Sequence, residues 1–393
     1  MTVVDLFCGC GGLSKGFELA GFSISAAFDG WSAAITCYNA NFEHEAYLRD
    51  LSDVDGSVEA ITAFKPTVII GGPPCQEFSN AGKRKEGARA DLTYDYARIV
   101  TTIRPQFFIM ENVPRVQNSK AYEKARRLYK EKEYGLTEVV LDASRCGVPQ
   151  KRKRFFCIGA LNEQDNFLLD SVFNACQDKE ISIREYFKAH NVPLEIDHYY
   201  RHPTTYTRRA IFSVDQASPT IRGVNRPKPE TYRRNKKDSV EESELKNVRA
   251  LTLAERATIQ TFPSDFRFND LGISKGDLEQ MVGNAVPVEL ARFVAERLLD
   301  YMKRKDHDGF DQDEFATWLR TEKRYTSDRS ISDVFSRIRR AESMLPDREI
   351  NRYFIADLAE EPNYQKLPTS VRSQIKKALN LRIAFESWKK NHD

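Results

Sequence analysis

Short apolar runs alternate with amphipathic segments along the first 160 residues of the chain. A short apolar run bounded by Gly, Pro or polar residues is typical of a buried strand, and apolar positions three and four residues apart are typical of a helix. We predict strands at residues 3–7, 23–28, 68–71, 107–110 and 155–158. We predict helices between them at residues 13–20, 32–39, 58–64 and 94–103. This alternation indicates an α/β fold with a doubly wound, mostly parallel sheet and helices on both faces.

The last ninety or so residues have a different pattern. Apolar residues recur at helical spacing there, and we predict a helical C-terminal extension over residues 305–393. Its basic clusters are interpreted as solvent-exposed helix faces, with contact to DNA or a partner as the alternative; they are Arg337, Arg339, Arg340, Lys376 and Lys377.

Composition excludes several classes of protein. The chain has 393 residues and a formal net charge of +3, which is too small to identify a partner. No run approaches the roughly 20 apolar residues needed to span a bilayer, and the N-terminus lacks a signal-peptide pattern. We therefore expect a cytoplasmic protein. Its seven cysteines have no metal-ligand spacing, so we expect reduced thiols and no metal.

The segment from Arg201 to Lys237 carries most of the charge asymmetry. It holds ten Lys or Arg residues against two acidic ones, and several prolines and tyrosines lie among them. Basic side chains on Pro-rich loops with interspersed aromatic rings favour contact with a nucleic-acid backbone. A basic flexible linker is the alternative interpretation.

Cys75 lies in the segment 71–79, Gly-Gly-Pro-Pro-Cys-Gln-Glu-Phe-Ser, directly after an apolar run. Two glycines and two prolines prevent the strand from continuing and prevent a helix from starting, so the thiol should lie at the carboxyl edge of the sheet. Ligands bind at that edge in open α/β sheets. The sequence favours a reactive thiol, although an inert buried cysteine is the alternative.

A glycine-rich turn follows the first predicted strand, in the segment 5–12, Asp-Leu-Phe-Cys-Gly-Cys-Gly-Gly. Such a turn lets the backbone approach a ligand, and Asp29 ends the second strand where it could accept hydrogen bonds from ribose hydroxyls. The glycine spacing is not the dinucleotide fingerprint. We therefore favour a nucleoside cofactor without a pyrophosphate, with a dinucleotide as the alternative.

Taken in order, these segments resemble the cytosine-specific DNA methyltransferases that modify carbon 5, of the bacterial restriction-modification type. The resemblance extends from Val3 to about Leu299. It rests on an ordered series of motifs: 5–12, Pro73-Pro74-Cys75-Gln76, Glu111-Asn112-Val113, Gln150-Lys151-Arg152-Lys153-Arg154, Arg249-Ala250-Leu251-Thr252, Gln260-Thr261-Phe262-Pro263 and Gln280-Met281-Val282-Gly283-Asn284-Ala285-Val286-Pro287.

The resemblance implies a catalytic set of Cys75, Glu111, Arg152 and Arg154. Carbon 5 of cytosine is a poor nucleophile, so Cys75 would first add to carbon 6 of the ring. Glu111 would protonate or hydrogen-bond nitrogen 3, and Arg154 would donate to the carbonyl oxygen of the base. Strand alternation puts Arg152 and Arg154 on one side, which we assign to the site, and their positive field would lower the pKa of Cys75.

The resemblance also implies S-adenosylmethionine as methyl donor, without a metal. Phe7 would pack on the cofactor, the glycines would bring main-chain groups to its amino-acid end, Asp29 would bind the ribose and Asp50 the adenine amino group. The full set of cofactor residues is Phe7, Gly9, Gly11, Gly12, Leu13, Asp29, Asp50, Leu51, Pro73, Leu92 and Asn284. Gly30 and Trp31 depart from the bulky apolar residue that many relatives carry directly after this carboxylate.

The substrate implied by the resemblance is a cytosine flipped out of duplex DNA. We expect a catalytic and cofactor-binding domain at residues 1–160, a target-recognition domain at 161–246 and a return to the catalytic domain at 247–304, before the extension. Arg222 and Arg226 would lie near base edges, where Arg commonly contacts guanine. The expected DNA contacts are Gln76, Ser79, Arg89, Arg208, Arg209, Thr220, Arg222 and Arg226.

These expectations describe a monomeric enzyme that acts on double-stranded DNA in a bacterial or phage-infected cytoplasm, associated with the nucleoid through DNA. A cognate restriction endonuclease is left open as a partner, and no membrane partner is expected. A transfer-RNA cytosine-5 methyltransferase is the alternative within enzymes, disfavoured by the long basic segment. A catalytically silent DNA-binding regulator would need a broken motif, and a dinucleotide oxidoreductase would have no use for Cys75, Glu111 and Arg154 together.

Overall fold

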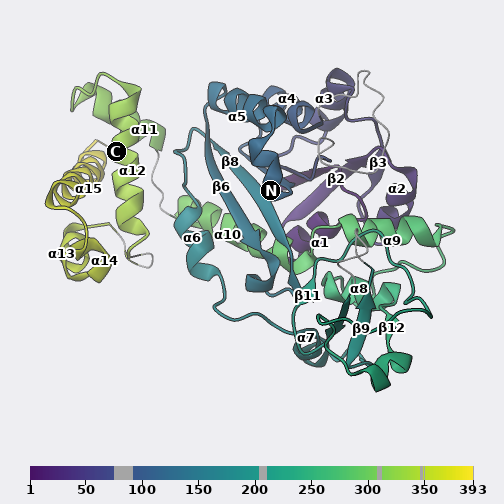
Figure 1. Ribbon diagram of the computed structural model, residues 1–393. Helices are drawn as coiled ribbons and strands as arrows, with labels where there is room; N and C mark the ends of the chain where they lie inside the picture. Colours follow the sequence, from purple (N-terminus) through teal and green to yellow (C-terminus); the bar gives the residue numbers. More distant parts are fainter. Residues whose placement is uncertain (75–91, 203–209, 308–311, 346–347, 349, 393) are drawn as a thin grey trace. The chain divides into compact units, whose positions relative to one another are not determined.

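The computed structural model describes residues 1–74, 92–202, 210–307, 312–345, 348 and 350–392. The chain divides into two compact units, Met1–Leu299 and Asp300–Asp393, which Figure 1 shows from purple to green and from green to yellow. No helix among these residues is long and apolar enough to cross a membrane.

A seven-stranded sheet forms the centre of the first unit, with strand order β3-β2-β1-β4-β5-β8-β6. Its strands are β1 (Thr2–Leu6), β2 (Ser23–Asp29), β3 (Ala46–Leu48), β4 (Val68–Gly71), β5 (Phe107–Asn112), β6 (Tyr134–Asp142) and β8 (Lys153–Leu161). The five strands from β3 to β5 are parallel, and β8 is antiparallel to both of its neighbours. The prediction of a doubly wound, mostly parallel sheet is confirmed.

The strand predicted at residues 155–158 is part of β8 and reverses direction for a topological reason. The connection from β6 to β8 contains a short 3-10 helix, Ala143–Arg145, and the two-residue strand β7 (Gln150–Lys151). A parallel neighbour would need a crossover of a dozen or more residues, whereas a short connection suffices for an antiparallel one. The direction of β8 is therefore set by the length of this connection.

Helices cover both faces of the sheet, as predicted. They are α1 (Gly12–Leu19), α2 (Ser32–Asn39), α3 (Val54–Thr62), α4 (Leu92–Ile103), α5 (Lys120–Glu131) and α10 (Val288–His307). On one face, α3, α4 and α5 bury a core against β1, β4 and β5 that includes Leu6, Ile69 and Phe108. On the other face, α1 approaches α10 so closely that a Cβ at Gly16 would lie 2.4 Å from Ala291 Cβ.

Among the strands of the central sheet and the helices that cover it, β3, β6, α5 and α10 were not predicted from the sequence. Helix α5 is strongly polar and buries only a narrow stripe, Ala121, Tyr122, Ala125 and Tyr129. Strand β6 contains Gly135, Thr137 and Glu138 and so lacks a continuous apolar run. The apolar residues of β6 and α5 can be recognised as core residues only from their tertiary contacts. For example, Tyr122 of α5 packs edge-on against Phe155 of β8.

Small sheets and short helices follow β8 along the chain. These elements are α6 (Leu169–Ala175), α7 (Ile183–Ala189), β9 (His198–Arg201), β10 (Ala210–Ser213), β11 (Ser218–Pro219), β12 (Arg249–Ala250), α8 (Leu253–Ile259) and α9 (Lys275–Asn284). Strands β10, β9 and β12 form one sheet, and β11 pairs with β7. Because β7 directly precedes β8, this pairing connects the small sheets to the central one.

Helix α9 packs against backbone at its C-terminal end. A Cβ at Gly283 would lie 2.1 Å from Gly223 N and 2.2 Å from Arg222 C, so only glycine allows the approach. We predict that Gly283→Ala lowers the free energy of unfolding of the first unit by more than about 1 kcal/mol, measured by thermal denaturation. Gly276→Ala in the same helix is the control, because its Cβ would meet nothing closer than 3.8 Å. That change should be neutral or stabilising by about 0.5–1 kcal/mol, and equal destabilisation by both would contradict the packing argument.

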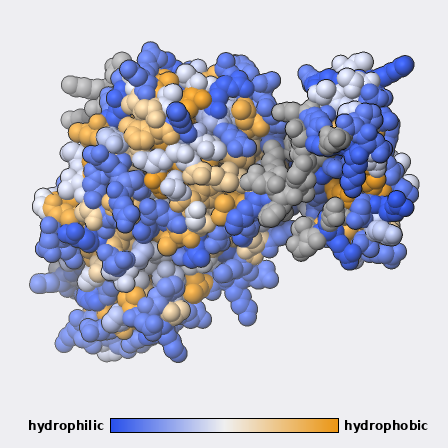
Figure 2. Space-filling view, turned by 180° about the vertical axis from the view of Figure 1, so that it is seen from behind, coloured by the Kyte–Doolittle hydropathy of each residue, from blue (hydrophilic) through white to orange (hydrophobic). Residues whose placement is uncertain are grey.

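The second unit is helical, in the region where the sequence predicts a helical extension. Its helices are α11 (Gln312–Thr321), α12 (Asp328–Glu342), α13 (Arg352–Glu360), α14 (Pro362–Gln365) and α15 (Thr369–Lys389). One core cluster gathers Phe315, Trp318 and Phe385, and a second gathers Phe354, Leu358 and Leu379. Figure 2 shows mostly hydrophilic side chains on the visible face of this unit, with small hydrophobic areas between them.

Candidate active site

The predicted motifs lie at the carboxyl ends of β1, β2, β4 and β5, which adjoin in the sheet. The glycine-rich turn follows β1, Asp29 ends β2, Gly72 to Pro74 follow β4, and Glu111 and Asn112 end β5. Since parallel strands present their carboxyl ends at one edge, residues separated by up to a hundred positions meet there.

The turn after β1 is held in conformations that favour glycine. Gly9 and Gly11 have φ values of 55° and 93°, and Phe7 also has a positive φ of 58°. A Cβ at Gly12 would lie 2.3 Å from Val286 O, so the turn packs directly on returning backbone. A Cβ at Gly9 would meet nothing within 4 Å, which leaves open space beside the turn. Gly11 caps α1 without a side-chain hydrogen bond, so this helix N-terminus suits a negatively charged group.

Asp29 faces this turn from the end of β2. Its two carboxylate oxygens accept hydrogen bonds from Gly9 N and from Trp31 N, each at 2.8 Å. Burial raises the pKa of Asp29, and the backbone donors oppose the increase. Each carboxylate oxygen can accept a further hydrogen bond, so the group can still bind ribose hydroxyls while it fixes the turn.

Asp5 lies beneath the turn in β1 and is fully buried. Its Oδ2 accepts a hydrogen bond of 2.6 Å from Ser14 Oγ, which in turn accepts one of 2.7 Å from Tyr38. Its Oδ1 has no hydrogen-bond partner among the described residues. Burial raises the pKa of Asp5 to about 8, partly opposed by the Ser14 hydrogen bond.

A pH-dependent stability follows from this burial. An unfolded Asp titrates near 3.9, so between about pH 4 and pH 8 the folded protein binds one more proton than the unfolded chain. The Asp5 contribution therefore favours folding at low pH and is lost as pH rises through this window. We predict that Asp5→Asn, which keeps an acceptor for Ser14, raises the melting temperature more at pH 8.5 than at pH 5.5. An equal shift at both pH values would show that Asp5 is ionised in the fold.

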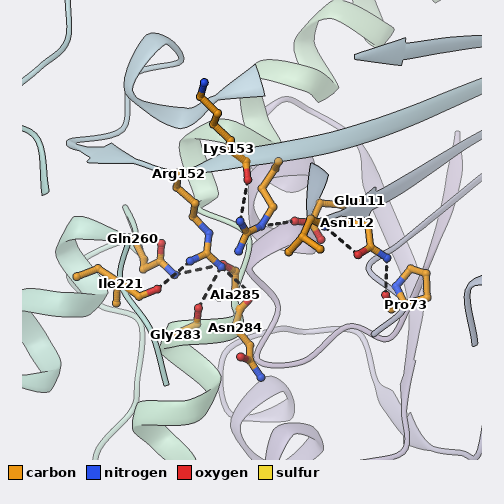
Figure 3. A network of polar contacts seen from close by, with 12 residues as sticks. Pro73, Glu111, Asn112, Arg152, Lys153, Ile221, Gln260, Gly283, Asn284 and Ala285 are labelled. Atoms are coloured by element: carbon orange, nitrogen blue, oxygen red, sulfur yellow. Dashed lines mark hydrogen bonds and ion pairs between the residues drawn. The ribbon is translucent and has the colours of Figure 1, made fainter. Parts of the chain in front are cut away.

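Glu111 and Arg154 form a buried ion pair at the end of β5. Arg154 Nε lies 2.8 Å from Glu111 Oε1, and the two side chains are 14% and 11% exposed. Burial raises the pKa of Glu111, and the positive charges of Arg154 and Arg152 oppose this increase. The carboxyl is thus held closer to its protonated form than a surface glutamate. Figure 3 shows Glu111 beside Asn112.

Arg152 has a different environment from Arg154. The alternation expected along this segment is confirmed, because Arg152 and Arg154 are buried or half-buried and Lys151 and Lys153 are exposed. However, the guanidinium of Arg152 donates to four main-chain oxygens: Ile221 O at 2.9 Å, Gly283 O at 3.0 Å, Asn284 O at 3.3 Å and Ala285 O at 3.0 Å. Figure 3 shows these bonds joining three segments. Arg152 is therefore engaged with backbone, and its side chain is 1% exposed.

The segment that leads to Cys75 is fixed at its base. Asn112 Nδ2 donates to Pro73 O at 2.8 Å, which ties the end of β5 to the turn after β4 (Figure 3). A Cβ at Gly72 would lie 3.1 Å from Glu111 Oε2, so glycine lets this backbone pass close to the carboxyl. Cys75 itself lies outside the described residues, and the last described residue before it, Pro74, is exposed.

Other expected cofactor residues occupy varied positions. Asp50 is exposed, and its Oδ1 accepts hydrogen bonds from Ser52 N and Oγ, which lower its pKa. Leu13 and Leu51 are buried, so only their main chain could reach a ligand. Leu92 begins α4 and is half-buried. Asn284 ends α9 and is exposed, and its Oδ1 accepts a 3.3 Å hydrogen bond from Gln280.

The expected DNA contacts are only partly described. Gln76, Ser79, Arg89, Arg208 and Arg209 lie outside the described residues. Thr220 is half-buried, and its hydroxyl donates to Lys151 O at 2.8 Å, so it connects the segment after β11 to β7. The side chains of Arg222 and Arg226 are exposed on the segment that follows.

Sequence reasoning did not assign roles to several residues of this network. Gln150 Nε2 donates to Gln260 Oε1 at 2.7 Å, and Gln150 Oε1 accepts from Ile221 N at 2.8 Å. Gln260 Nε2 also donates to Val282 O and Ala285 O. Gln150, Gln260 and Asn112 belong to the motifs on which the family resemblance rests. Membership of those motifs was therefore the one feature of the sequence that could have indicated a role for them. Their partners lie tens of residues away, and sequence spacing does not reveal them.

The other described cysteines are all free. Cys8, Cys10, Cys37, Cys146 and Cys157 are buried, and Cys176 is half-buried. Burial raises the pKa of each of these thiols. They therefore fit the inert structural role expected for the six cysteines other than Cys75.

Comparison with known sequences identifies relatives of the first unit. The family model described as "C-5 cytosine-specific DNA methylase" matches residues 1–300. The Type II methyltransferase M.HindV of Haemophilus influenzae is 51% identical over 304 residues, covering 77% of this chain and 98% of that protein. The Type II methyltransferase M.HgiDI of Herpetosiphon aurantiacus is 50% identical over 305 residues, covering 77% and 96%.

Solved structures of low sequence identity share the fold. The S. pombe Dnmt2 methyltransferase has a TM-score of 0.60 at 19% identity, with 77% of this chain and 99% of that chain covered. The Entamoeba histolytica methyltransferase EhMeth has a TM-score of 0.54 at 20% identity, with 77% and 98% covered.

Proposed function

The chain belongs to the C-5 cytosine-specific DNA methylase family and is a DNA (cytosine-5)-methyltransferase, and from this premise we propose how its residues perform the reaction. The observation that carries the proposal is the buried Glu111–Arg154 pair, with Pro73 tied to Asn112 beside it. This arrangement puts an acid with a raised pKa and a hydrogen-bond donor next to the segment that leads to Cys75.

Cys75 is the nucleophile in this mechanism. Its thiolate adds to carbon 6 of the cytosine, and the ring becomes electron-rich enough at carbon 5 to accept a methyl group. A base then removes the proton from carbon 5, and the thiolate leaves as the ring double bond re-forms. Asn112 supports this step by holding the Pro73 carbonyl, which lies two residues before the nucleophile.

Glu111 stabilises the electron-rich ring. Addition of the thiolate increases the basicity of nitrogen 3, and a carboxyl that is protonated or strongly hydrogen-bonded there lowers the barrier. Burial supports this role because it raises the pKa of Glu111. Arg154 holds the carboxyl in place and could direct a remaining N–H toward the carbonyl oxygen of the base.

Arg152 serves the reaction as a positioning residue. Its bonds to Ile221, Gly283, Asn284 and Ala285 join the recognition segment to the end of α9 and to the strand that bears Arg154. Movement of the recognition segment on DNA would therefore be transmitted to the catalytic pair and to Asn284.

S-adenosylmethionine is the proposed cofactor and supplies the methyl group as an electrophilic sulfonium. The residues fit this molecule, because open space beside Gly9 adjoins an uncapped helix N-terminus and the Asp29 carboxylate. The α1 N-terminus would bind the methionine carboxylate. Asp29 would bind the ribose, Phe7 would pack on the cofactor, and Asp50 would accept from the adenine amino group. No metal is needed for this chemistry.

Residues 161–246 form the proposed target-recognition domain, between a catalytic domain at 1–160 and its return at 247–304. Arg222 and Arg226 would lie near base edges of the duplex DNA, where Arg commonly contacts guanine. We place this activity in the cytoplasm. The Type II names of the relatives also suggest a cognate restriction endonuclease.

Transfer of labelled methyl groups to duplex DNA and to transfer RNA tests the function directly. We expect label in duplex DNA, on carbon 5 of cytosine, and none above background in transfer RNA. Label only in RNA would support the transfer-RNA alternative, and binding of DNA without any transfer would support a silent regulator. Bisulfite sequencing of a host that expresses the protein would then give the target sequence.

A further inference from the structure

The groove between α15 and the end of α11 is a candidate interaction surface of the C-terminal unit. Its lining consists of Lys323, Ser373, Lys376, Lys377, Asn380, Leu381 and Ala384. Three of these residues are cations, two carry polar groups that can donate hydrogen bonds, and none is acidic. The three lysines, Ser373 and Asn380 are all exposed. This unit, Asp300–Asp393, begins where the match to the family ends.

The helix that lines the groove distributes its charges unevenly. Helix α15 has five basic residues and one acid, Glu386. Arg382 pairs with Glu386 at 3.2 Å, and Lys389 pairs with Glu314 of α11. No described residue forms an ion pair with Lys323, Lys376 or Lys377. The ion pairs of Arg382 and Lys389 neutralise charge elsewhere on α15, so the uncompensated positive charge of this helix is concentrated in the groove.

Lys323, which lines the groove, lies over a buried aromatic ring of α11. Lys323 Nζ lies 4.8 Å from the centroid of the Trp318 ring, which is 3% exposed and packs against Phe385 at 5.7 Å. A cation held on a buried aromatic ring loses less side-chain freedom when it binds an anion. Lys323 therefore adds a cation from another segment to the exposed face of α15 that carries Lys376 and Lys377.

We propose that this groove binds the phosphate backbone of double-stranded DNA. It would give the enzyme an affinity for DNA that does not depend on base sequence, in addition to the binding by its recognition segment. Neighbouring lysines with hydroxyl and amide donors match a polyanion whose charges repeat closely along one direction. The remaining lining residues, Leu381 and Ala384, are apolar, so no acidic side chain in the lining would repel the phosphates. The established activity brings duplex DNA to this protein, and an acidic protein partner is the competing occupant.

The salt dependence of DNA binding by the full-length protein tests the proposal. We expect K323Q/K376Q/K377Q to reduce the slope of log K against log salt by about 2 to 3 on a random-sequence duplex, because each lost phosphate contact contributes about 0.9. The matched control R352Q/K366Q/K390Q removes three exposed charges of the same unit outside the groove. It should change the slope by less than about 1.

Two results would overturn the inference. One is an unchanged slope in the groove variant, as expected for an acidic protein partner, and the other is an equal change in both triple variants. Methyl transfer at low salt and saturating DNA should remain at the wild-type level in the groove variant. A wild-type protein that binds DNA through the groove but transfers no methyl group would refute the enzymatic mechanism and leave the groove proposal standing.

Discussion

Cys75→Ser is expected to reduce methyl transfer to duplex DNA by at least about three orders of magnitude, because a serine hydroxyl is a far weaker nucleophile than a thiolate. The remaining residues can bind and orient the base but cannot activate carbon 5. The variant should keep its melting temperature, since the described polar contacts of the site hold Pro73, Glu111 and Arg154 independently of the thiol. Initial rates with labelled S-adenosylmethionine measure the effect.

Cys176→Ser is the matched control for this experiment. Cys176 is the half-buried thiol at the end of α6, and burial raises its pKa. Its replacement should leave the rate unchanged. With DNA that contains 5-fluorocytosine, the wild-type protein should form a covalent complex, because fluorine blocks the final elimination, and Cys75→Ser should not. A Cys75→Ser protein as active as wild type, or turnover without an adduct, would contradict nucleophilic addition by Cys75.

The strand ends that build the site could be predicted from sequence because they are local features. The turn after β1, the Gly-Gly-Pro-Pro segment after β4 and Glu111 at the end of β5 each follow a buried apolar run. Neighbouring parallel strands present their carboxyl ends at the same edge of the sheet, so residues at these ends lie close together. Their proximity therefore follows once the runs are identified as strands.

The contacts of Arg152 could not be predicted in this way. Its acceptors are main-chain oxygens 69 to 133 residues away, and any residue type offers such an oxygen. Alternation along residues 151–154 correctly predicted that the Arg152 side chain is buried, but it could not distinguish the partners of Arg152 from those of Arg154. The missed elements β6 and α5 have the same cause, because their narrow apolar stripes become recognisable only in the folded packing.

Glu111→Gln is expected to lower kcat by about 10² to 10⁴ while DNA binding changes little. The amide keeps the shape of the carboxyl and can donate a weak hydrogen bond to nitrogen 3, but it cannot transfer a proton. It also removes the charge that Arg154 pairs with at 2.8 Å, so the base contact from Arg154 loses its orientation. Single-turnover rates at saturating DNA would measure this loss separately from binding.

Glu138→Gln is the matched control. Glu138 also forms a 2.8 Å ion pair, with Arg126, but it lies on β6 away from the site. It should leave kcat unchanged. The pH profile gives a second readout. Since burial raises the pKa of Glu111, the wild-type rate should fall as pH rises and the Glu111 proton is lost. This descending limb should be absent from Glu111→Gln. A kcat within a few-fold of wild type, with the limb retained, would exclude Glu111 as the acid.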